Sequence, residues 1–151
     1  MSDPSPTDSS YMAGLVDGEG SIYMAKTDSS NRSGKPYTSF CVGITITLTV
    51  PADVLDWVVE KFGGAICGSK RGAPGHKDRR KWYVNRAEDV EKILVQILPY
   101  LQIKQEQAKL AIGYYAERRK FGHHLGDKGR MMAEAYKAQF HGLNSKGNVG
   151  S

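Results

Sequence analysis

The sequence contains few cysteines and no long hydrophobic run, and these two absences limit what kind of protein it can be. Two cysteines, Cys41 and Cys67, are too few for a disulfide framework, so we expect free thiols in a reducing compartment. No apolar stretch reaches the ~18 residues that a membrane-spanning helix needs. Residues 1–10 lack the basic and apolar regions of a secretory signal, so we expect a protein that is neither secreted nor inserted into a membrane.

Cysteine and histidine also lack the spacing of a zinc site. The adjacent pair His123 and His124 has no cysteine nearby, so we interpret it as part of an exposed loop. With 151 residues, of which 40% are hydrophobic, the chain has the size and composition of one globular domain with a hydrophobic core.

Positive charge is concentrated in one part of the chain. The formal net charge is +5, which by itself says little about binding partners. Residues 69–86, however, contain seven lysines and arginines and a single acidic residue, Asp78, with Trp82 and Tyr83 among them. Such a segment is either a solvated hairpin or a pair of strands that contacts the phosphates and bases of a nucleic acid.

Hydrophobic periodicity divides the chain into helices and strands. Five helices are expected, over residues 8–17 (capped by Asp8), 51–62, about 90–98, 103–120 and 130–140. Four strands are expected, over residues 21–27, 38–50, 65–71 and 79–85. In the second strand, apolar Val42, Ile44, Ile46 and Leu48 alternate with small residues, so one face should be buried and the other open.

We therefore expect an α+β domain in which two hairpins form a four-stranded antiparallel sheet, with helices packed on its apolar face. The domain should occupy residues 8–141. A disordered tail is expected at residues 1–7 and a flexible tail at residues 142–151, where the composition is rich in Gly, Asn, Ser and Lys.

The most informative segment is residues 12–20, Met-Ala-Gly-Leu-Val-Asp-Gly-Glu-Gly, which begins as a helix and ends as a turn. Its small residues, Ala13 and Gly14, lie where a second helix could approach closely. Glu19 stands between two glycines at the end of the helix, and a carboxylate held there beside exposed backbone is able to bind a divalent metal. The segment occurs once in the chain.

This segment resembles the LAGLIDADG motif of homing endonucleases, and the resemblance extends over residues 11–120. Residues 99–108 are similar to the segment that follows the sheet in single-motif, homodimeric members of that family, and residues 143–146 to its C-terminal DNA-contacting loop. The resemblance implies the family's αββαββα fold, with a saddle-shaped sheet and extra C-terminal helices. It also implies a homing endonuclease, in a microbial cytoplasm or an organelle, that makes a staggered double-strand break in a long pseudo-palindromic DNA site.

The same resemblance assigns two catalytic residues. Glu19 occupies the position of the family's metal-binding acid and, with the carbonyl of Gly18, would hold Mg²⁺; Mn²⁺ should substitute, and Ca²⁺ should bind without cleavage. Lys104 matches the family's active-site lysine, whose ammonium stabilises negative charge or positions water, although it also fits an ordinary lysine on a helix surface. Asp17 would accept backbone hydrogen bonds near the helix end.

A homodimer follows from the single motif, because one copy supplies one Glu19 and cutting both DNA strands needs two. Two motif helices would pack through Ala13, Gly14 and Asp17.

Further residues are expected to contact double-stranded DNA, since alternation places side chains along the open face at the spacing of base pairs. The expected contacts are Tyr23, Ala25, Thr27, Arg32, Lys35, Cys41, Gly43, Thr45, Thr47, Ser69, Lys70, Arg71, Lys81, Tyr83, Asn144, Ser145 and Lys146.

One position departs from the family pattern. Where single-motif relatives usually carry a glutamine that orients water, an ungapped comparison places Val50. Either Thr47, Thr49 or another polar group would take that role, or the water network is rearranged. Two other functions stay open on the same fold: an RNA-binding maturase that assists intron splicing, and a non-catalytic DNA-binding regulator. The presence of both Glu19 and Lys104 favours the nuclease.

Overall fold

The computed structural model describes residues 3–49, 53–68 and 79–149, with side chains as far as residue 145. The elements in chain order are α1 (Pro6–Glu19), β1 (Gly20–Ser30), β2 (Pro36–Thr49), α2 (Val54–Phe62), β3 (Ala65–Gly68), β4 (Arg79–Val84), α3 (Ala87–Ile97), the 3₁₀ turn η1 (Leu98–Tyr100), α4 (Gln105–Arg118) and α5 (Gly126–Val149). The predicted α+β class and the αββαββα order, followed by further helices, are confirmed.

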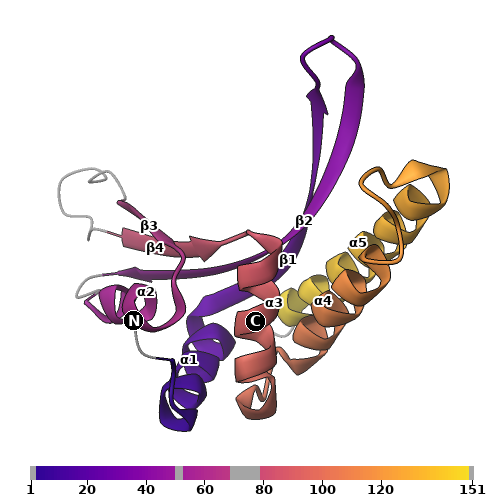
Figure 1. The fold of residues 1–151 in the computed structure, drawn as a ribbon. Coiled ribbons are helices and arrows are strands. Elements are labelled where there is room, and N and C mark those ends of the chain that lie inside the picture. Colours follow the sequence, from indigo (N-terminus) through magenta and orange to yellow (C-terminus); the bar gives the residue numbers. More distant parts are fainter. Residues whose placement is uncertain (1–2, 50–52, 69–78, 150–151) are drawn as a thin grey trace.

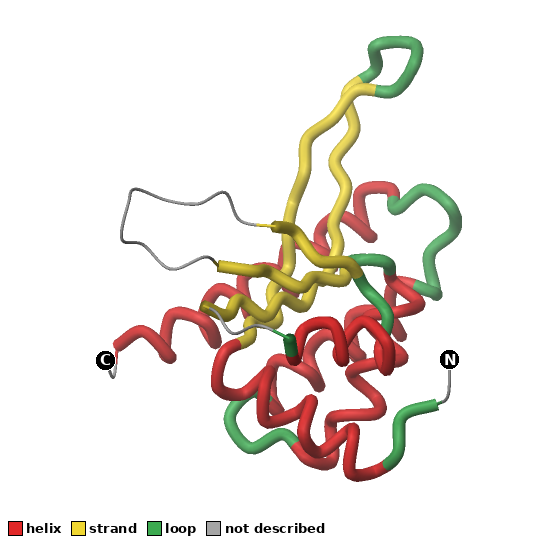
Figure 2. Tube along the Cα trace, turned by 90° about the vertical axis from the view of Figure 1, so that its left-hand side faces the viewer, coloured by secondary structure: helices red, strands yellow, loops and turns green. Residues whose placement is uncertain are grey.

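The four strands form one antiparallel sheet in the order β1-β2-β4-β3. In Figure 1 the helices lie below and to one side of the sheet, and none covers its upper face. Helices α1 and α3 pack against β2, α2 packs against β3 and β4, and α4 and α5 pack against β1. The β1–β2 hairpin extends well beyond this packed region (Figures 1 and 2).

Alternation in β2 explains why one face of the sheet is covered. Val42, Ile44 and Ile46 have no exposed surface, and Leu48 packs at the margin of the core. Trp82 of β4 lies on the same face, fully buried, and its indole N–H donates a 2.8 Å hydrogen bond to the carbonyl oxygen of Gly63. Burial of these side chains fixes the register, since a shift by one residue would expose the whole apolar set.

Helix α1 begins two residues before the predicted start, and the capping prediction for Asp8 is wrong. Ser5 is the N-cap: its hydroxyl accepts from the Asp8 backbone N–H at 3.1 Å, and the Asp8 carboxylate accepts from the Ser5 N–H at 2.9 Å. This reciprocal capping box satisfies two donors of the first turn, and Pro6 fits the position that follows the cap. Residues 6 and 7, expected in a disordered tail, are therefore helical.

Helix α5 contradicts the prediction for the C-terminal segment. It begins at Gly126 rather than residue 130 and continues to Val149, through residues expected to form a flexible tail. The other expected ends differ from the structure by a few residues, while Val50, Pro51 and residues 69–71 lie outside the described part of the chain. No helix in the described part is long and apolar enough to cross a membrane.

Candidate functional site

The candidate site is built at the junction between α1 and β1. Glu19 is the last residue of α1 and is exposed, and Gly20 starts the strand without an intervening loop. A Cβ atom at Gly20 would lie 2.8 Å from Val16 Cα and 3.0 Å from the carbonyl oxygen of Thr45, so only glycine allows the backbones to approach this closely. The close packing at Gly20 holds Glu19 in a defined place at the end of the helix.

Asp17, two residues before Glu19, ties this junction to a distant part of the chain. Its carboxylate accepts three backbone hydrogen bonds, from the N–H groups of Gln102 at 2.7 Å, Ile103 at 3.2 Å and Lys104 at 2.9 Å. The predicted role of Asp17 as an acceptor of backbone hydrogen bonds is confirmed, but the donors belong to the segment that enters α4. A carboxylate suits this position because it neutralises unpaired N–H groups where a helix begins.

Lys104 adds a second contact between the start of α4 and the end of α1. It is the N-cap residue of α4, half-buried, and its ammonium Nζ donates a 2.8 Å hydrogen bond to the backbone carbonyl of Asp17. The two residues assigned catalytic roles are thereby brought to the same end of α1. Within the described residues, the Glu19 carboxylate makes no hydrogen bond or ion pair, so it is available to a ligand.

The exposed face of α1 differs from the predicted one. Gly14 and Gly18 are exposed, and a Cβ atom added at either would meet nothing within 4 Å. Ala13, however, has no exposed surface and belongs to the hydrophobic core, so its predicted contact with a second helix is wrong. The i, i+4 pair of glycines, rather than Ala13, forms the surface that another helix could approach.

The donor atoms at this junction fit a hard cation only in part. The Glu19 carboxylate and the neighbouring Gly18 carbonyl are oxygen donors of the kind that Mg²⁺ prefers. Across residues 3–49, 53–68 and 79–149, no group of three or more His, Cys, Asp or Glu side chains is placed to hold a metal. One copy of this chain therefore offers an incomplete set of ligands, which water, phosphate oxygens or a second copy would have to complete.

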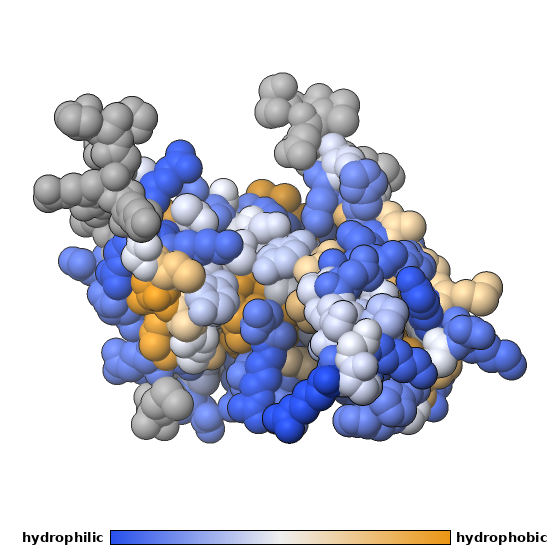
Figure 3. Space-filling view, turned by 90° about the horizontal axis from the view of Figure 1, so that it is seen from above, coloured by the Kyte–Doolittle hydropathy of each residue, from blue (hydrophilic) through white to orange (hydrophobic). Residues whose placement is uncertain are grey.

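The strand register places the predicted DNA contacts on the open face of the sheet. Tyr23, Ala25 and Thr27 of β1 lie opposite Gly43, Cys41 and Ser39 of β2. Thr45 and Thr47 lie opposite Tyr83 and Lys81 of β4. Seen from above in Figure 3, the described residues present a mainly hydrophilic surface with scattered hydrophobic side chains.

Gly43 is an exception, because it is buried beneath a neighbouring side chain. A Cβ atom at Gly43 would lie 2.5 Å from the ring of Tyr23, which crosses β2 at this point. The predicted DNA contact of Gly43 is therefore wrong, and Tyr23 takes its place on the surface. Burial raises the pKa of Cys41, two residues away, and burial together with the Cys41 thiol raises that of Tyr23.

Asn144 also has a different environment from the one expected. Its amide nitrogen donates to the Ile22 carbonyl at 3.2 Å, and its amide oxygen accepts from Gln107 Nε2 at 3.4 Å. Asn144 therefore joins α5 to β1 and α4, and it does not lie on an open surface. Arg32 and Lys35 are exposed at the hairpin tip, Ser145 is half-buried, and the side chain of Lys146 lies outside the described part.

Further residues share the open face and were not expected to contact DNA, among them Ser21, Ser39, Cys67 and Arg79. Ser21 and Ser39 lie opposite Thr45 and Thr27, Arg79 lies opposite Thr49, and Cys67 lies opposite Lys81. Strand parity alone would have found them, because each is separated by an even number of residues from a predicted contact on its own strand.

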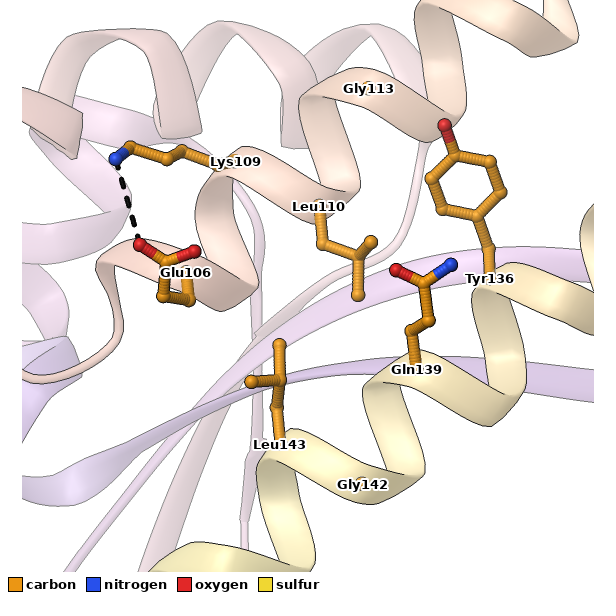
Figure 4. A pocket seen from close by; sticks show the side chains of 8 residues that line it. All are labelled: Glu106, Lys109, Leu110, Gly113, Tyr136, Gln139, Gly142 and Leu143. Atoms are coloured by element: carbon orange, nitrogen blue, oxygen red, sulfur yellow. Dashed lines mark ion pairs between the residues drawn. The ribbon is translucent and has the colours of Figure 1, made fainter.

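A shallow hollow of about 520 Å³ between α4 and α5 contains none of the predicted site residues. Figure 4 shows Leu110 and Leu143 pointing across it, with Tyr136 at one end and the Glu106–Lys109 ion pair, 3.6 Å long, at the other. Two glycines in its lining, Gly113 and Gly142, leave the space between the helices open. Its lining offers no cluster of groups for catalysis.

Several solved homing endonucleases have a similar arrangement of elements. The chain matches I-CvuI, solved in complex with its target, with a TM-score of 0.70 and 20% identity over 91% of this chain and 82% of that chain. It matches I-TnaI with a TM-score of 0.68 and 20% identity, over 92% of this chain and 89% of that chain. It matches the archaeal intron-encoded I-Vdi141I, solved in complex with DNA, with a TM-score of 0.67 and 19% identity, over 91% of this chain and 84% of that chain.

The LAGLIDADG homing endonuclease I-SmaMI, bound to cleaved DNA, matches with a TM-score of 0.66 and 19% identity. Here the match covers 86% of this chain but 42% of that chain. No protein-family model and no curated protein matches the sequence. The chain therefore has the LAGLIDADG homing endonuclease fold, as its resemblance to that family predicts.

Proposed function

We propose that this chain is a homodimeric, Mg²⁺-dependent homing endonuclease that makes a staggered break in a long pseudo-palindromic DNA site. One observation carries the proposal: the Asp17 carboxylate and the Lys104 ammonium hold the start of α4 against the end of α1, beside Glu19. A carboxylate and an ammonium group that lie far apart in sequence are therefore found at the same end of α1, which supports a joint role.

Each residue has a role that its position supports. Glu19 would hold the cation through its exposed carboxylate, with the Gly18 carbonyl beside it. When bound there, Mg²⁺ would activate water and stabilise charge on the scissile phosphate. Lys104 adds a positive charge close by, suited to stabilise the negative charge that develops on the phosphate. Thr47 and Thr49 are exposed on β2 and are the described polar groups suited to orient water in place of the missing glutamine.

The dimer is supported by the exposed surface around α1. Gly14 and Gly18 leave the helix backbone accessible, and two large hydrophobic side chains flank it, Tyr11 with 53% and Ile103 with 70% of its surface exposed. Packing of two such helices would bury these apolar side chains beside the small-residue face, which favours association. The chain also spans most of the I-CvuI, I-TnaI and I-Vdi141I chains but under half of I-SmaMI, as expected for one of two equal halves.

DNA binding would use the open face of the sheet. Its threonines, Tyr83 and Lys81 stand in rows across β2 and β4, and side chains two residues apart on a strand lie ~6.7 Å apart, close to two base steps. Direct contacts of this kind in a major groove give base specificity, while lysines and arginines contribute affinity for phosphates.

The test begins with selection of cleaved molecules from a random duplex library in the presence of Mg²⁺, which supplies a target. On that target, Glu19→Gln should keep DNA binding and lose cleavage by about 10²-fold or more, because the amide cannot replace the carboxylate as a metal ligand. Glu19→Asp should retain measurable cleavage, and Glu60→Gln, an exposed acid of α2, should cleave like the original chain.

Three outcomes would contradict the proposal. Cleavage by Glu19→Gln at the original rate would remove Glu19 from the site. Duplex binding without cleavage under any divalent cation would favour a DNA-binding regulator. Specific binding of an intron RNA, without cleavage of any duplex, would favour the maturase.

A further inference from the structure

A second surface with the chemistry of a nucleic-acid site lies at the hairpin end of the sheet, and it includes Arg32 and Lys35 of the expected DNA contacts and Ser39 of the open face. A groove of about 1120 Å³ runs between the tip of the β1–β2 hairpin and the loop that joins α4 to α5. Figures 1 and 2 both show the hairpin projecting beside the end of the α4–α5 pair. One wall belongs to the hairpin, and the other consists of residues 118–130, to which no role has been assigned above.

The groove is basic. Four of its lining residues are lysine or arginine and one, Asp127, is acidic. Arg118 donates a hydrogen bond to the Gly122 carbonyl at 3.1 Å. In the described part of the chain, Arg32, Lys35 and Arg130 make no hydrogen bond or ion pair through their side chains. Unpaired cations converging from two separate elements favour a ligand with several negative charges.

The groove also contains aromatic surface and a rigid wall. Tyr37 is 50% exposed, and Phe40 packs partly into the core beneath the groove. The hairpin loop is held by Asn31, whose side-chain oxygen accepts from the N–H groups of Ser33 at 3.0 Å and Lys35 at 2.9 Å. Because these bonds order the backbone of the loop in advance, the backbone loses little entropy when a ligand binds.

From this combination we infer that the groove binds a single strand of nucleic acid, a few nucleotides at a time. Proteins that bind single strands combine a positively charged groove with aromatic rings on which bases stack. The volume is close to that of a pocket for a drug-sized ligand, which suits a few nucleotides and is far too small for a duplex. An acidic peptide would use the cations but would leave the exposed face of Tyr37 without a partner.

The test measures the binding of short labelled oligothymidine and oligouridine to the full-length chain by fluorescence anisotropy, and it does not depend on whether the chain cleaves duplex DNA. Saturable binding should weaken with salt, with a slope of about −2 in log–log form if three phosphates are contacted. Stronger binding of either oligonucleotide supports the inference and identifies RNA or DNA as the source of the strand.

Two substitutions locate the binding. Arg130→Gln should weaken it at least fivefold, while Lys92→Gln, which removes an exposed charge from α3, should leave it unchanged. Tyr37→Leu should weaken it at least fivefold and Tyr37→Phe less than twofold, because phenylalanine keeps the stacking surface. Unchanged thermal unfolding of each variant shows that the fold is intact, since all three positions are exposed.

Three results would overturn the inference: no saturable binding at physiological salt, equal competition by oligoglutamate, or equal affinity in all of these variants. Equal competition would point to an acidic peptide as the ligand, and equal affinity would place the strand elsewhere on the chain. Duplex cleavage measured in parallel reports on the Glu19 site, which the groove does not include, so failure of this inference is distinguishable from failure of the proposed nuclease function.

Discussion

Replacement of Asp17 by alanine tests the connection on which the candidate site depends. The Asp17 carboxylate accepts hydrogen bonds from three consecutive backbone N–H groups, at 2.7, 3.2 and 2.9 Å. Hydrogen bonds to a charged group contribute about 1.5–3 kcal/mol each when they are well shielded. Gln102 and Ile103 are exposed, however, so water would replace part of what is lost.

We therefore expect Asp17→Ala to lower the free energy of unfolding by about 2–3 kcal/mol, less than the sum of three shielded bonds. For a domain of this size such a loss corresponds to a fall in Tm of about 5–10 °C. Asp17→Asn should be similarly destabilising. Its amide oxygen can still accept from two of the donors, but its NH₂ group would face the third, the N–H of Gln102.

Thermal unfolding followed by circular dichroism measures the stability, and amide hydrogen exchange measures the connection itself. The amides of residues 102–104 should exchange slowly in the original chain and rapidly in Asp17→Ala, with Glu60→Ala as the control carboxylate. Unfolding within about 0.5 kcal/mol of the original chain, together with protected amides at residues 102–104, would refute the reasoning, because surface changes have effects of that size. Loss of DNA cleavage exceeding the loss of folded protein would tie the connection to Lys104.

Three further predictions concern the helix, the junction and the α4–α5 pair. Gly14→Leu should leave the folded chain intact, since nothing lies within 4 Å of a Cβ atom at this position, but it should give a monomer on target DNA in sedimentation. The control Gly142→Leu should remain a dimer. Gly20→Ala should destabilise by about 2–3 kcal/mol in urea unfolding, because its Cβ would meet backbone, whereas Gly142→Ala should cost little. Burial and the hydrogen bond to Glu117 raise the pKa of Tyr136 to about 12. The protonated hydroxyl therefore contributes fully to folding stability below about pH 10, and this contribution is lost as the pH rises toward 12. In Tyr136→Phe, the urea midpoint should depend less on pH over that range.

The sheet and its faces could be predicted because they depend on local alternation. Val42, Ile44 and Ile46 repeat every second residue, and this period alone decides which face is buried. The same parity places Cys67 and Arg79 on the open face, so their position too follows from the sequence. Burial of Gly43 was different in kind, because it depends on the Tyr23 ring from the neighbouring strand.

The helix ends depend on competition between local signals and distant contacts. At the N-terminus both Ser5 and Asp8 are residue types that cap helices well. Because they form a capping box together, with Ser5 as the N-cap, α1 begins at Pro6 and not after Asp8. At the C-terminus, residues 142–149 have a composition that favours irregular structure. Asn144 is nevertheless bonded to Ile22 and Gln107, and such tertiary contacts outweigh the weak helix propensity of the segment.

The position of Lys104 follows from the same kind of long-range contact, and its chemistry suits the proposed reaction. A salt bridge between Lys104 and Glu19 would neutralise both side chains, and each would then have to be released before binding a phosphate or a cation. Lys104 instead donates to the uncharged carbonyl of Asp17, and within the described residues the Glu19 carboxylate has no partner. Asp17 thus holds the backbone of Lys104 with its carboxylate and the ammonium with its carbonyl, which keeps opposite charges close together but separate. For metal-assisted cleavage of a phosphodiester, this arrangement leaves the Glu19 carboxylate free for the cation, while the Lys104 ammonium keeps its charge and its two other N–H donors for the phosphate.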